Sequence, residues 1–252
     1  MRMKKLLSFL LVLTLLFGCV SLFSGCARRV TYENEEDYSV GAFETDEEIH
    51  TVEIYWDGRG VSVSAAFRDK IRAQEDYENA DAKAMRYAIS DGVLKIYPCA
   101  SGKSVEKLAK TLFLELPMEI VDGLRSLKIE TAGRTKVNLQ MMKAEKLTVI
   151  AKDGNVSIDG ALSRVFVETK TGNFDIKSAT ITELDFKSLT GNANLNLHLQ
   201  GFLAVMREEE GTFRTDYDVS ENGTLFSYGS QEAFLAFTTE GTVNLKDYDI
   251  AQ

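Results

Sequence analysis

The side chains of this sequence that could support catalysis are mainly carboxylates on predicted strands. Hydrolysis of a glycosidic bond needs two carboxyl groups at a fixed separation, and Asp159, Asp175 and Asp185 are the outward-facing candidates. They fall at different places in their strands, so their spacing does not require them to meet. We interpret them as solvated positions of half-buried strands. We therefore predict no catalytic residue and no enzymatic activity, with a carbohydrate-active enzyme as the least favoured alternative.

Thiols and imidazoles are also sparse. The chain has three cysteines, Cys19, Cys26 and Cys99, and two histidines, His50 and His198. A nucleophilic thiol needs a neighbouring base, and Cys99, in "KIYPCASG", is better interpreted as a small half-buried hydrophobic residue. The acidic stretch "EEDYSVGAFETDEE" lacks oxygen ligands at fixed alternating positions around a glycine, which a calcium loop requires. We predict no metal site and no cofactor.

The N-terminus is predicted to be a lipoprotein signal peptide. "MRMKKLLSFLLVLTLLFGCVSLFSGC" has a basic start, an apolar run from Leu6 and small residues before Cys26, which is typical of a secretory signal. Its last residues resemble the bacterial lipobox, in which the cysteine is lipidated and becomes the new N-terminus. Residues 1–25 would then be removed, and Cys26 would hold the chain at the extracytoplasmic face of the cell membrane. Lipidation at Cys19, an uncleaved membrane anchor and ordinary signal cleavage stay open as alternatives.

Charge narrows the range of partners. The formal net charge is -9, and removal of residues 1–25 takes away three basic residues and no acidic one, which leaves -12. Such a surface repels nucleic acid, so we predict no nucleic-acid partner. Residues 26–47 carry a dense acidic run without an apolar period, which predicts a flexible, extended tether. Within it, Arg28 and Arg29 would lie at the level of lipid phosphates if Cys26 is lipidated; otherwise they are the polar flank of the signal.

The rest of the chain, residues 48–250, is predicted to be one domain built from strands. Alternating residues at 52–56 and 61–63 flank a glycine turn, and a further strand pair is expected around the Asp-Gly pair at 91–92. A strand at 112–116 follows a helix-like turn and ends at Pro117. Residues 75–84 give no clear pattern.

A repeat fills the second half of the domain. Its units share alternating apolar columns on both sides of a glycine, at spacings of 18 and 19 residues between the first three glycines. The glycines on which the units are aligned are Gly154, Gly172, Gly191 and Gly241. A further unit at residues 127–139 contains one inserted residue. In the unit of Gly241, Phe234, Ala236 and Thr238 are the predicted inward residues.

Each unit is predicted to be two short strands joined by a bend that glycine makes at positive φ. One unit cannot bury its apolar face alone, whereas stacked units build a continuous core. The asparagines that follow the glycines, Asn155, Asn173 and Asn192, would then form a hydrogen-bonded ladder. The sequence therefore predicts an all-β, right-handed parallel β-helix-like solenoid with rungs of about 18–20 residues. An antiparallel β-sandwich or meander, with Asp153-Gly154 as a hairpin turn, is the alternative.

Residues 203–231 interrupt the repeat. Turn chemistry at Glu210-Gly211 and Asn222-Gly223 predicts an inserted hairpin or loop. Because insertions on repeat scaffolds often form the binding surface, residues 206–230 are the first candidate contact surface. A cover for the edge of the last strand is the alternative.

Several of these motifs resemble, in this order, the putative adhesin family of bacterial envelope proteins: "VEIYWDGRGVSV", "ISDGVLKIY", "LFLELP" with "SLKIET", the Gly-Asn rungs and "FLAFTTEGTVNLKD". The resemblance covers residues 48–247. It implies an all-β domain on the outer side of a membrane and supplies no catalytic residue. We therefore predict a cell-surface lipoprotein with a binding, adhesion or structural role, and an envelope protein or a glycan as partner. A membrane-tethered accessory of an envelope stress response is the alternative.

Overall fold

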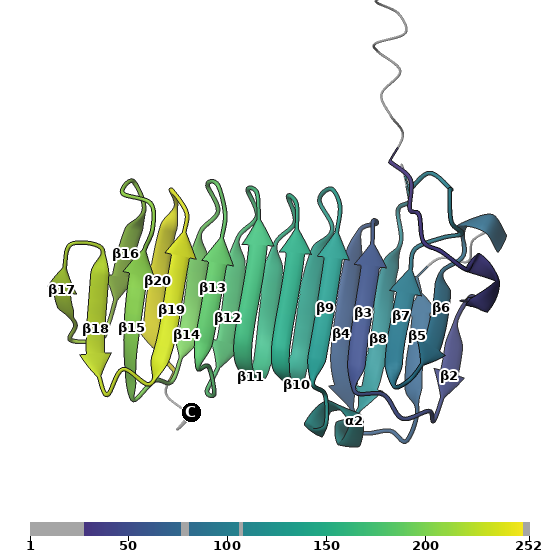
Figure 1. Cartoon of the computed structure of the whole chain (residues 1–252), viewed down its shortest axis with the longest axis horizontal. Helices are drawn as coiled ribbons and strands as arrows, with labels where there is room; N and C mark the ends of the chain where they lie inside the picture. Colours follow the sequence, from purple (N-terminus) through teal and green to yellow (C-terminus); the bar gives the residue numbers. More distant parts are fainter. Residues whose placement is uncertain (1–27, 77–80, 106–107, 249–252) are drawn as a thin grey trace, which may run out of the picture.

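The computed structural model describes residues 28–76, 81–105 and 108–248 (Figure 1). The predicted signal peptide, residues 1–25, and the predicted lipidation site Cys26 lie outside the described residues. Strands dominate the described part, in which the one α-helix is α2 (Met118–Asp122), beside the short 3-10 helices η1 (Glu35–Asp37) and η2 (Asp81–Lys83). The all-β prediction is therefore confirmed. No helix in the described part is long and apolar enough to cross a membrane.

Most strands belong to two facing layers. In the first layer, each strand pairs in parallel with the next. The order is β7 (Val93–Tyr97), β3 (Thr51–Trp56), β9 (Ser126–Thr131), the second half of β10 (Lys136–Ala151), the second half of β11 (Val156–Thr169), β13 (Glu183–Lys187), β19 (Ala233–Thr238) and β15 (Gly201–Met206).

The second layer is also parallel. Its order is β8 (Thr111–Pro117), β4 (Gly60–Ala66), the first halves of β10 and β11, β12 (Phe174–Ser178), β14 (Ala193–Leu197), β20 (Thr242–Asp247) and β16 (Thr212–Thr215). The long strands β10 and β11 pass from one layer to the other and join them into one 20-stranded sheet. The antiparallel alternative is wrong for these units, because Asp153-Gly154 connects the two layers and does not close a hairpin.

Antiparallel strands occur only at the two ends of the described stack. At the N-terminal end, β6 (Arg86–Ser90) and β1 (Ser39–Val40) extend the first layer, and β5 (Ile71–Glu75) and β2 (Phe43–Thr45) extend the second. At the other end, β18 (Leu225–Gly229) and β17 (Ser220–Asn222) follow β15. The predicted strand pair at Asp91-Gly92 is confirmed, since β6 and β7 are joined there by two residues with positive φ, as a tight hairpin requires.

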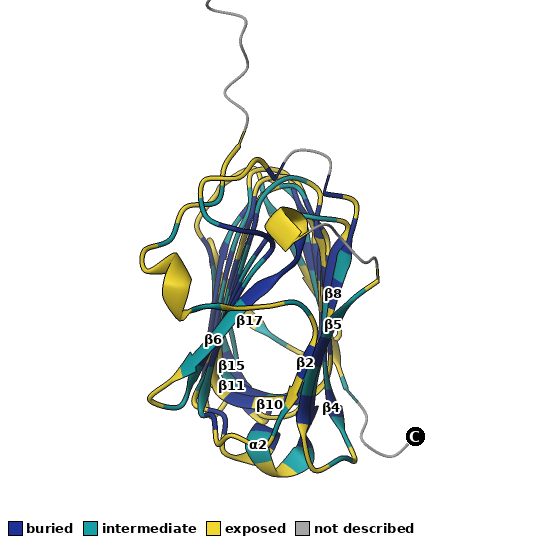
Figure 2. Ribbon diagram, turned by 90° about the vertical axis from the view of Figure 1, so that its right-hand side faces the viewer, coloured by how far each residue is buried: buried dark blue, intermediate teal, exposed yellow. Residues whose placement is uncertain are grey.

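The core lies between the two layers (Figure 2). Alternation along each strand points every second side chain inward, and parallel pairing in register places these side chains in continuous columns. One column of the first layer contains Leu94, Val52, Leu127, Leu147 and Val165, all at most 2% exposed. The period-two pattern in the sequence therefore determines both the inward face and the stacking.

The repeat glycines lie at one edge of the stack, which we call the turn edge; it is the upper edge in Figure 1. We predicted that these glycines adopt positive φ, and this is wrong: Gly154, Gly172, Gly191 and Gly241 are not among the positive-φ glycines. They are needed for a different reason. A Cβ on Gly172 would overlap the carbonyl oxygen of Gly154, and a Cβ on Gly191 would overlap that of Gly172. The glycines thus allow successive turns to stack in direct backbone contact.

The predicted asparagine ladder is present. The side-chain oxygen of Asn155 accepts a hydrogen bond from the backbone N–H of Asn173 at 3.0 Å, and Asn173 does the same for Asn192 at 3.2 Å. Asn192 continues the series to the N–H of Thr242. A second ladder, which the sequence analysis missed, joins Asn244 to Asn194 and Asn194 to Asp175 on the outer face of the second layer.

The unit of Gly241 is shifted by one residue from the prediction. Leu184 pairs with Leu235 and Phe186 with Phe237, so the inward residues are Leu235 and Phe237. The predicted Phe234 faces outward and is 42% exposed. The reason is a turn one residue shorter than in the preceding units, and such a slip exchanges the two faces of a strand.

Residues 203–231 are less irregular than predicted. Most of β15 and the whole of β16 form a further unit at the end of the stack, beyond β19 and β20. Only β17 and β18 make a hairpin, and β18 pairs antiparallel with β15. The predicted alternative, a cover for the edge of the last strand, describes this arrangement better than a projecting loop.

The predicted tether is the largest correction. Residues 29–45 pack along the domain: β1 pairs with β6, β2 pairs with β5, and the backbone of Val30 hydrogen-bonds with Lys103 and Gly102. Phe43 is 8% exposed and stacks on Tyr87. The many acidic residues favoured the prediction of an extended chain. A small set of apolar and aromatic residues in the same segment is buried, however, and this burial holds the segment in place.

Candidate functional site

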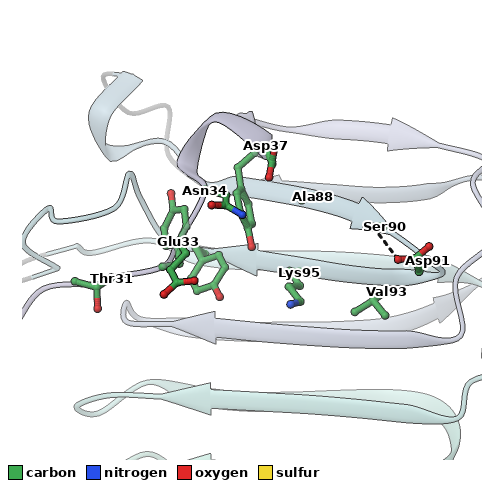
Figure 3. Close-up of a pocket in the computed structure, with 12 residues that line it drawn as sticks. Thr31, Glu33, Asn34, Asp37, Ala88, Ser90, Asp91, Val93 and Lys95 are labelled. Carbon is green, nitrogen blue, oxygen red and sulfur yellow. Dashed lines mark hydrogen bonds between the residues drawn. The ribbon is translucent and has the colours of Figure 1, made fainter.

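A cleft of about 540 Å³ lies on the outer face of the first layer, at its N-terminal end (Figure 3). Its floor is formed by the outward side chains of β6 and β7. These are mostly short: Ala88 lies opposite Lys95 in register, and Ser90 lies opposite Val93. Because the floor residues are small, the sheet leaves space that a flat row of long side chains would fill.

The wall of the cleft is the segment of residues 31–38, from the stretch that the sequence analysis assigned to a tether. It contributes Glu33, Asn34 and Asp37. Asn34 has φ 54 and ψ 53 and precedes η1, a left-handed conformation that asparagine tolerates well. The segment is held by Tyr32, whose hydroxyl donates to the carbonyl of Cys99 at 3.1 Å and whose N–H donates to Ser101.

Four tyrosines join the wall to the floor. Tyr97 stacks on Tyr32 with ring centroids 4.2 Å apart, and on Tyr55 of the neighbouring strand at 4.9 Å. Tyr38 meets Tyr97 edge-on. Burial raises the pKa of Tyr32 to about 12 and also raises the pKa values of Tyr55 and Tyr97. Their hydroxyls therefore stay protonated at neutral pH. The hydroxyls of Tyr32 and Tyr55 already donate to the Cys99 carbonyl and to Glu53, so toward a ligand they can act as acceptors.

The polar groups of the cleft are predominantly acidic. Glu33, Asp37 and Asp91 supply carboxylates, against the single ammonium group of Lys95 among the lining residues. Ser90, Thr31 and Asn34 add neutral hydrogen-bonding groups. No group of three His, Cys, Asp or Glu side chains converges closely enough to hold a metal ion in the described part of the chain. The cleft is suited to a polar ligand that is uncharged or positively charged.

The N-terminal end of the stack also contains a buried ion pair, which does not line the cleft. Lys110 is 2% exposed, pairs with Glu75 and donates to the carbonyl of Lys83 at 2.7 Å. Its ammonium also lies 5.1 Å from the Trp56 ring centroid. Burial lowers the pKa of Lys110, and Glu75 offsets part of this effect. This pair could not be predicted from the sequence, because Glu75 and Lys110 are far apart in the chain.

The carboxylates considered from the sequence do not form a site. Asp159 and Asp175 lie on the outer face of the second layer, where Asp175 accepts a hydrogen bond from Asn194 at 2.7 Å. Asp185 lies on the first layer and is paired with Lys187 and Arg207. Asp185 therefore lies on another face than Asp159 and Asp175, and the three do not converge.

The histidines do not activate the free cysteine. Cys99 is fully buried at the turn edge among Val105, Leu108 and Val30, and burial raises its pKa. His50 and His198 lie at the opposite edge of the stack, where His50 contacts Thr51 and His198 contacts Asp247. Cys99 is thus an apolar packing residue, as predicted, but it is fully buried and not half-buried.

The predicted contact surface, residues 206–230, forms the C-terminal end of the stack. Its outward side chains include Leu225, which is 42% exposed and lies opposite Val205 in register. With Leu203 and Phe234 they make an apolar patch on the outer face of the first layer. The patch is apolar, whereas the cleft at the other end offers polar groups that could orient a ligand.

The comparisons with known proteins do not identify the chain. No family model and no curated protein matches it. Among solved structures, a putative cell adhesion protein from Clostridium sporogenes has a TM-score of 0.49 at 13% identity, covering 83% of this chain and 100% of that chain. A putative adhesin from Bacteroides fragilis has a TM-score of 0.44 at 12% identity, covering 83% and 97%. A putative lipid binding protein from Parabacteroides distasonis has a TM-score of 0.30 at 11% identity, covering 86% and 99%.

The putative adhesin family therefore stays a prediction. At these identities and TM-scores, the three likenesses establish neither a family nor a function for this chain. A function can therefore be inferred only from the geometry of the chain itself.

Proposed function

We propose that this chain is a non-catalytic binding protein of the bacterial cell envelope, and that the cleft between residues 31–38 and strands β6 and β7 binds a carbohydrate. We propose further that its rungs form a right-handed β-helix-like solenoid and that Cys26 carries a lipid that holds it at the extracytoplasmic face of the membrane. The observation that carries the binding proposal is the cleft itself, with its tyrosine hydroxyls and carboxylates above a floor of small residues.

A sugar suits this set of groups. Hydroxyl-rich ligands need many neutral donors and acceptors, and Thr31, Asn34 and Ser90 supply them beside the tyrosines. Carboxylates add strong acceptors for sugar hydroxyls. Because Lys95 is the one cation of the lining, an acidic sugar would be repelled. We therefore expect neutral or amine-bearing oligosaccharides to bind more tightly than acidic ones.

The binding proposal is tested by filling the floor of the cleft. Ala88→Trp would occupy the space above β6 without touching an inward side chain, and we expect it to weaken binding of the preferred oligosaccharide about tenfold or more. Thr148→Trp is the matched control, since Thr148 also faces outward from the first layer. Isothermal titration calorimetry with neutral, amine-bearing and carboxylate-bearing oligosaccharides gives the affinities. Equal affinity of the two variants, or preference for acidic sugars, would reject the cleft as a carbohydrate site.

The anchor is tested separately by metabolic labelling with a palmitate analogue. We expect the wild-type chain to incorporate label and Cys26→Ala to lose it, because thioether-linked lipid requires the thiol. Cys19→Ala is the control and should retain the label. Label that persists in the Cys26→Ala chain would exclude lipidation at this residue.

A further inference from the structure

The turn edge has a different charge from the rest of the molecule. Exposed basic side chains follow it from the chain entry to the middle of the stack: Arg28, Arg29, Arg59, Lys103, Arg134, Lys136, Lys152 and Lys170. In the described part of the chain, no carboxylate forms an ion pair with Arg134, Lys136, Lys152 or Lys170. A chain of net charge -9 thus presents a row of cations along one edge. Arg28 and Arg59 are paired with Asp57 and Asp76, and Asp153 lies beside Lys152, so the net excess of positive charge comes from the cations without an ion pair.

The opposite edge carries more acidic than basic side chains. Its basic residues are Arg68, Lys70, Arg125 and Lys143, and its acidic residues are Asp46, Glu47, Glu48, Asp69, Asp91, Glu119, Asp122, Glu145, Asp216, Asp218 and Glu232. The far end of the turn edge is acidic as well, because Glu208, Glu209 and Glu210 follow β15 and Glu240 follows β19. The charge is therefore polarised in two directions, from edge to edge and along the turn edge.

The chain enters the domain on the basic part of this edge. Arg28 pairs with Asp57 of the β3–β4 turn at 3.3 Å, and the backbone of Arg28 accepts a hydrogen bond from Val105. The entering segment lies at the upper edge in Figure 1. A flexible tether would leave every orientation of the domain open, whereas this fixed entry sets the turn edge beside the proposed lipid on Cys26, two residues before Arg28.

Part of the row forms a recess of about 600 Å³ beside the β3–β4 turn, lined by Arg59, Arg134 and Lys136. Arg59 is paired there with Asp76 at 2.8 Å, so Arg134 and Lys136 are the basic side chains of the recess that can bind an anion. Thr111 and Ser62 supply hydroxyls in the same recess. This set of groups suits a phosphate group that approaches from the edge.

We propose that the basic part of the turn edge docks on the anionic phospholipid headgroups of the membrane that holds the chain. Basic side chains near a membrane surface are attracted within a Debye length, and the acidic edge is repelled to the far side. The N-terminal end of the stack then lies close to the bilayer, and the acidic turn of Glu208, Glu209 and Glu210 lies farther from it. The cleft opens on the side of the molecule, so it stays accessible. The proposal uses the anchored position of the chain but does not depend on the carbohydrate cleft.

The orientation can be measured on vesicles. The chain from residue 27, with an N-terminal histidine tag, is held on vesicles that contain a small fraction of nickel-chelating lipid in phosphatidylcholine, with or without phosphatidylglycerol. Every contact described above lies within residues 28–248. Single fluorophores are placed at Thr171→Cys on the turn edge or Ala179→Cys on the opposite edge of the same unit; both positions are exposed, and the native Cys99 is buried. Headgroup-level quenching reports which edge faces the lipid.

With phosphatidylglycerol we expect the probe at residue 171 to be quenched several-fold more than the probe at residue 179, and the difference to disappear at high salt. Arg134→Glu/Lys152→Glu/Lys170→Glu should abolish the difference. The matched control Lys70→Glu/Arg125→Glu/Lys143→Glu makes the same charge change on the opposite edge and should preserve it. Circular dichroism shows whether the variants fold. If a variant does not fold, the salt series on the chain without charge substitutions still tests the proposal.

Equal quenching at the two positions, or stronger quenching at residue 179, would overturn the proposal. The second result would assign membrane contact to the opposite edge, where Phe67 is 92% exposed. Equal quenching together with retention of the chain on immobilised polyphosphate would assign the basic edge to a soluble polyanion. Loss of carbohydrate binding in Ala88→Trp leaves the quenching unchanged, so failure of either proposal can be recognised independently.

Discussion

Between β9 and β14 each unit of the stack repeats the one before it. The N-terminal end continues the two parallel layers through β3, β4, β7 and β8, but adds features to them that do not recur in the described units. In the middle, the inward columns, the glycine contacts and the asparagine ladder recur from unit to unit. At the N-terminal end, the β6–β7 hairpin, the curled segment of residues 31–38 and the Lys110–Glu75 pair each occur once. The middle depends on uniform backbone stacking, and the end depends on individual side chains.

This difference explains where a binding site can arise. In the middle of the stack successive side chains lie side by side on the outer faces, and the pocket beside Lys146, Arg164 and Glu183 there has a volume of about 220 Å³, less than half that of the cleft. The N-terminal end acquires concavity because residues 31–38 leave the sheet plane and cover Tyr97. Substitutions in this segment change the cleft without changing the register of the units. The candidate site and the repeated scaffold are therefore separated along the stack axis.

The largest expected effect comes from breaking the buried ion pair at the N-terminal end. Glu75→Leu leaves the ammonium of Lys110 buried without its carboxylate, and we expect it to lower the free energy of unfolding by about 3–5 kcal/mol. The double variant Glu75→Leu/Lys110→Met removes both charges and should recover most of this loss. Urea unfolding followed by circular dichroism measures both values. A double variant as unstable as the single one would show that the pair acts through packing and not through charge.

The stability of the wild-type chain and of Glu75→Leu depends on pH, and the sign of this dependence follows from the pKa of Lys110. Burial lowers the pKa of Lys110 in the folded chain, so between that value and the ordinary lysine pKa the unfolded chain binds more protons. Stability then rises with pH across this window. In Glu75→Leu the offset from Glu75 is gone, so the window widens and the rise becomes larger. Glu75→Leu/Lys110→Met should lose this contribution.

The next effect comes from the middle of the stack. Gly172→Ala places a methyl group onto the carbonyl oxygen of Gly154. The contact cannot relax by a rotamer change, because the carbonyl belongs to the backbone and the position of a Cβ is fixed by its own backbone. We expect a loss of about 2–3 kcal/mol in the free energy of unfolding. Gly123→Ala is the control, because its Cβ would lie 3.9 Å from the nearest atom and its φ of -101 suits alanine. A cost for Gly172→Ala no larger than for Gly123→Ala would reject the stacking role of the repeat glycines.

The regular part of the molecule could be predicted from the sequence because each unit supplies evidence for the others. The period of two identified the inward residues Val165 and Val167, and alignment of the glycines set the register of three units. The structural role of the repeat glycines was predicted wrongly. A sequence shows that glycine has no Cβ, but it does not show which neighbouring atom would clash with one. The register of β19 was missed because the alignment assumed turns of equal length, and the Gly241 turn is shorter.

The candidate site could not be predicted, for a related reason. Tyr32 and Tyr38 lie in "TYENEEDY", where acidic charge favours an extended, hydrated chain. Their partner Tyr97 is about sixty residues away along the chain, and nothing periodic links them. Two aromatic residues inside an acidic run were the available signal. They indicate a segment that can bury apolar surface, but they do not show which surface it covers.

The smallest expected effect tests whether the middle of the stack is uniform. Asn173→Ala removes the side-chain acceptor of the Asn192 N–H, and because the site is exposed, water replaces most of the lost bond. We expect a loss of about 0.5–1 kcal/mol in the free energy of unfolding. Asn155→Ala and Asn192→Ala remove the equivalent bonds to Asn173 and Thr242. If the units are independent, the three costs should agree and should add in the triple variant. A triple cost well above the sum would show that the ladder is cooperative, so that the middle, like the N-terminal end, depends on a network of side chains.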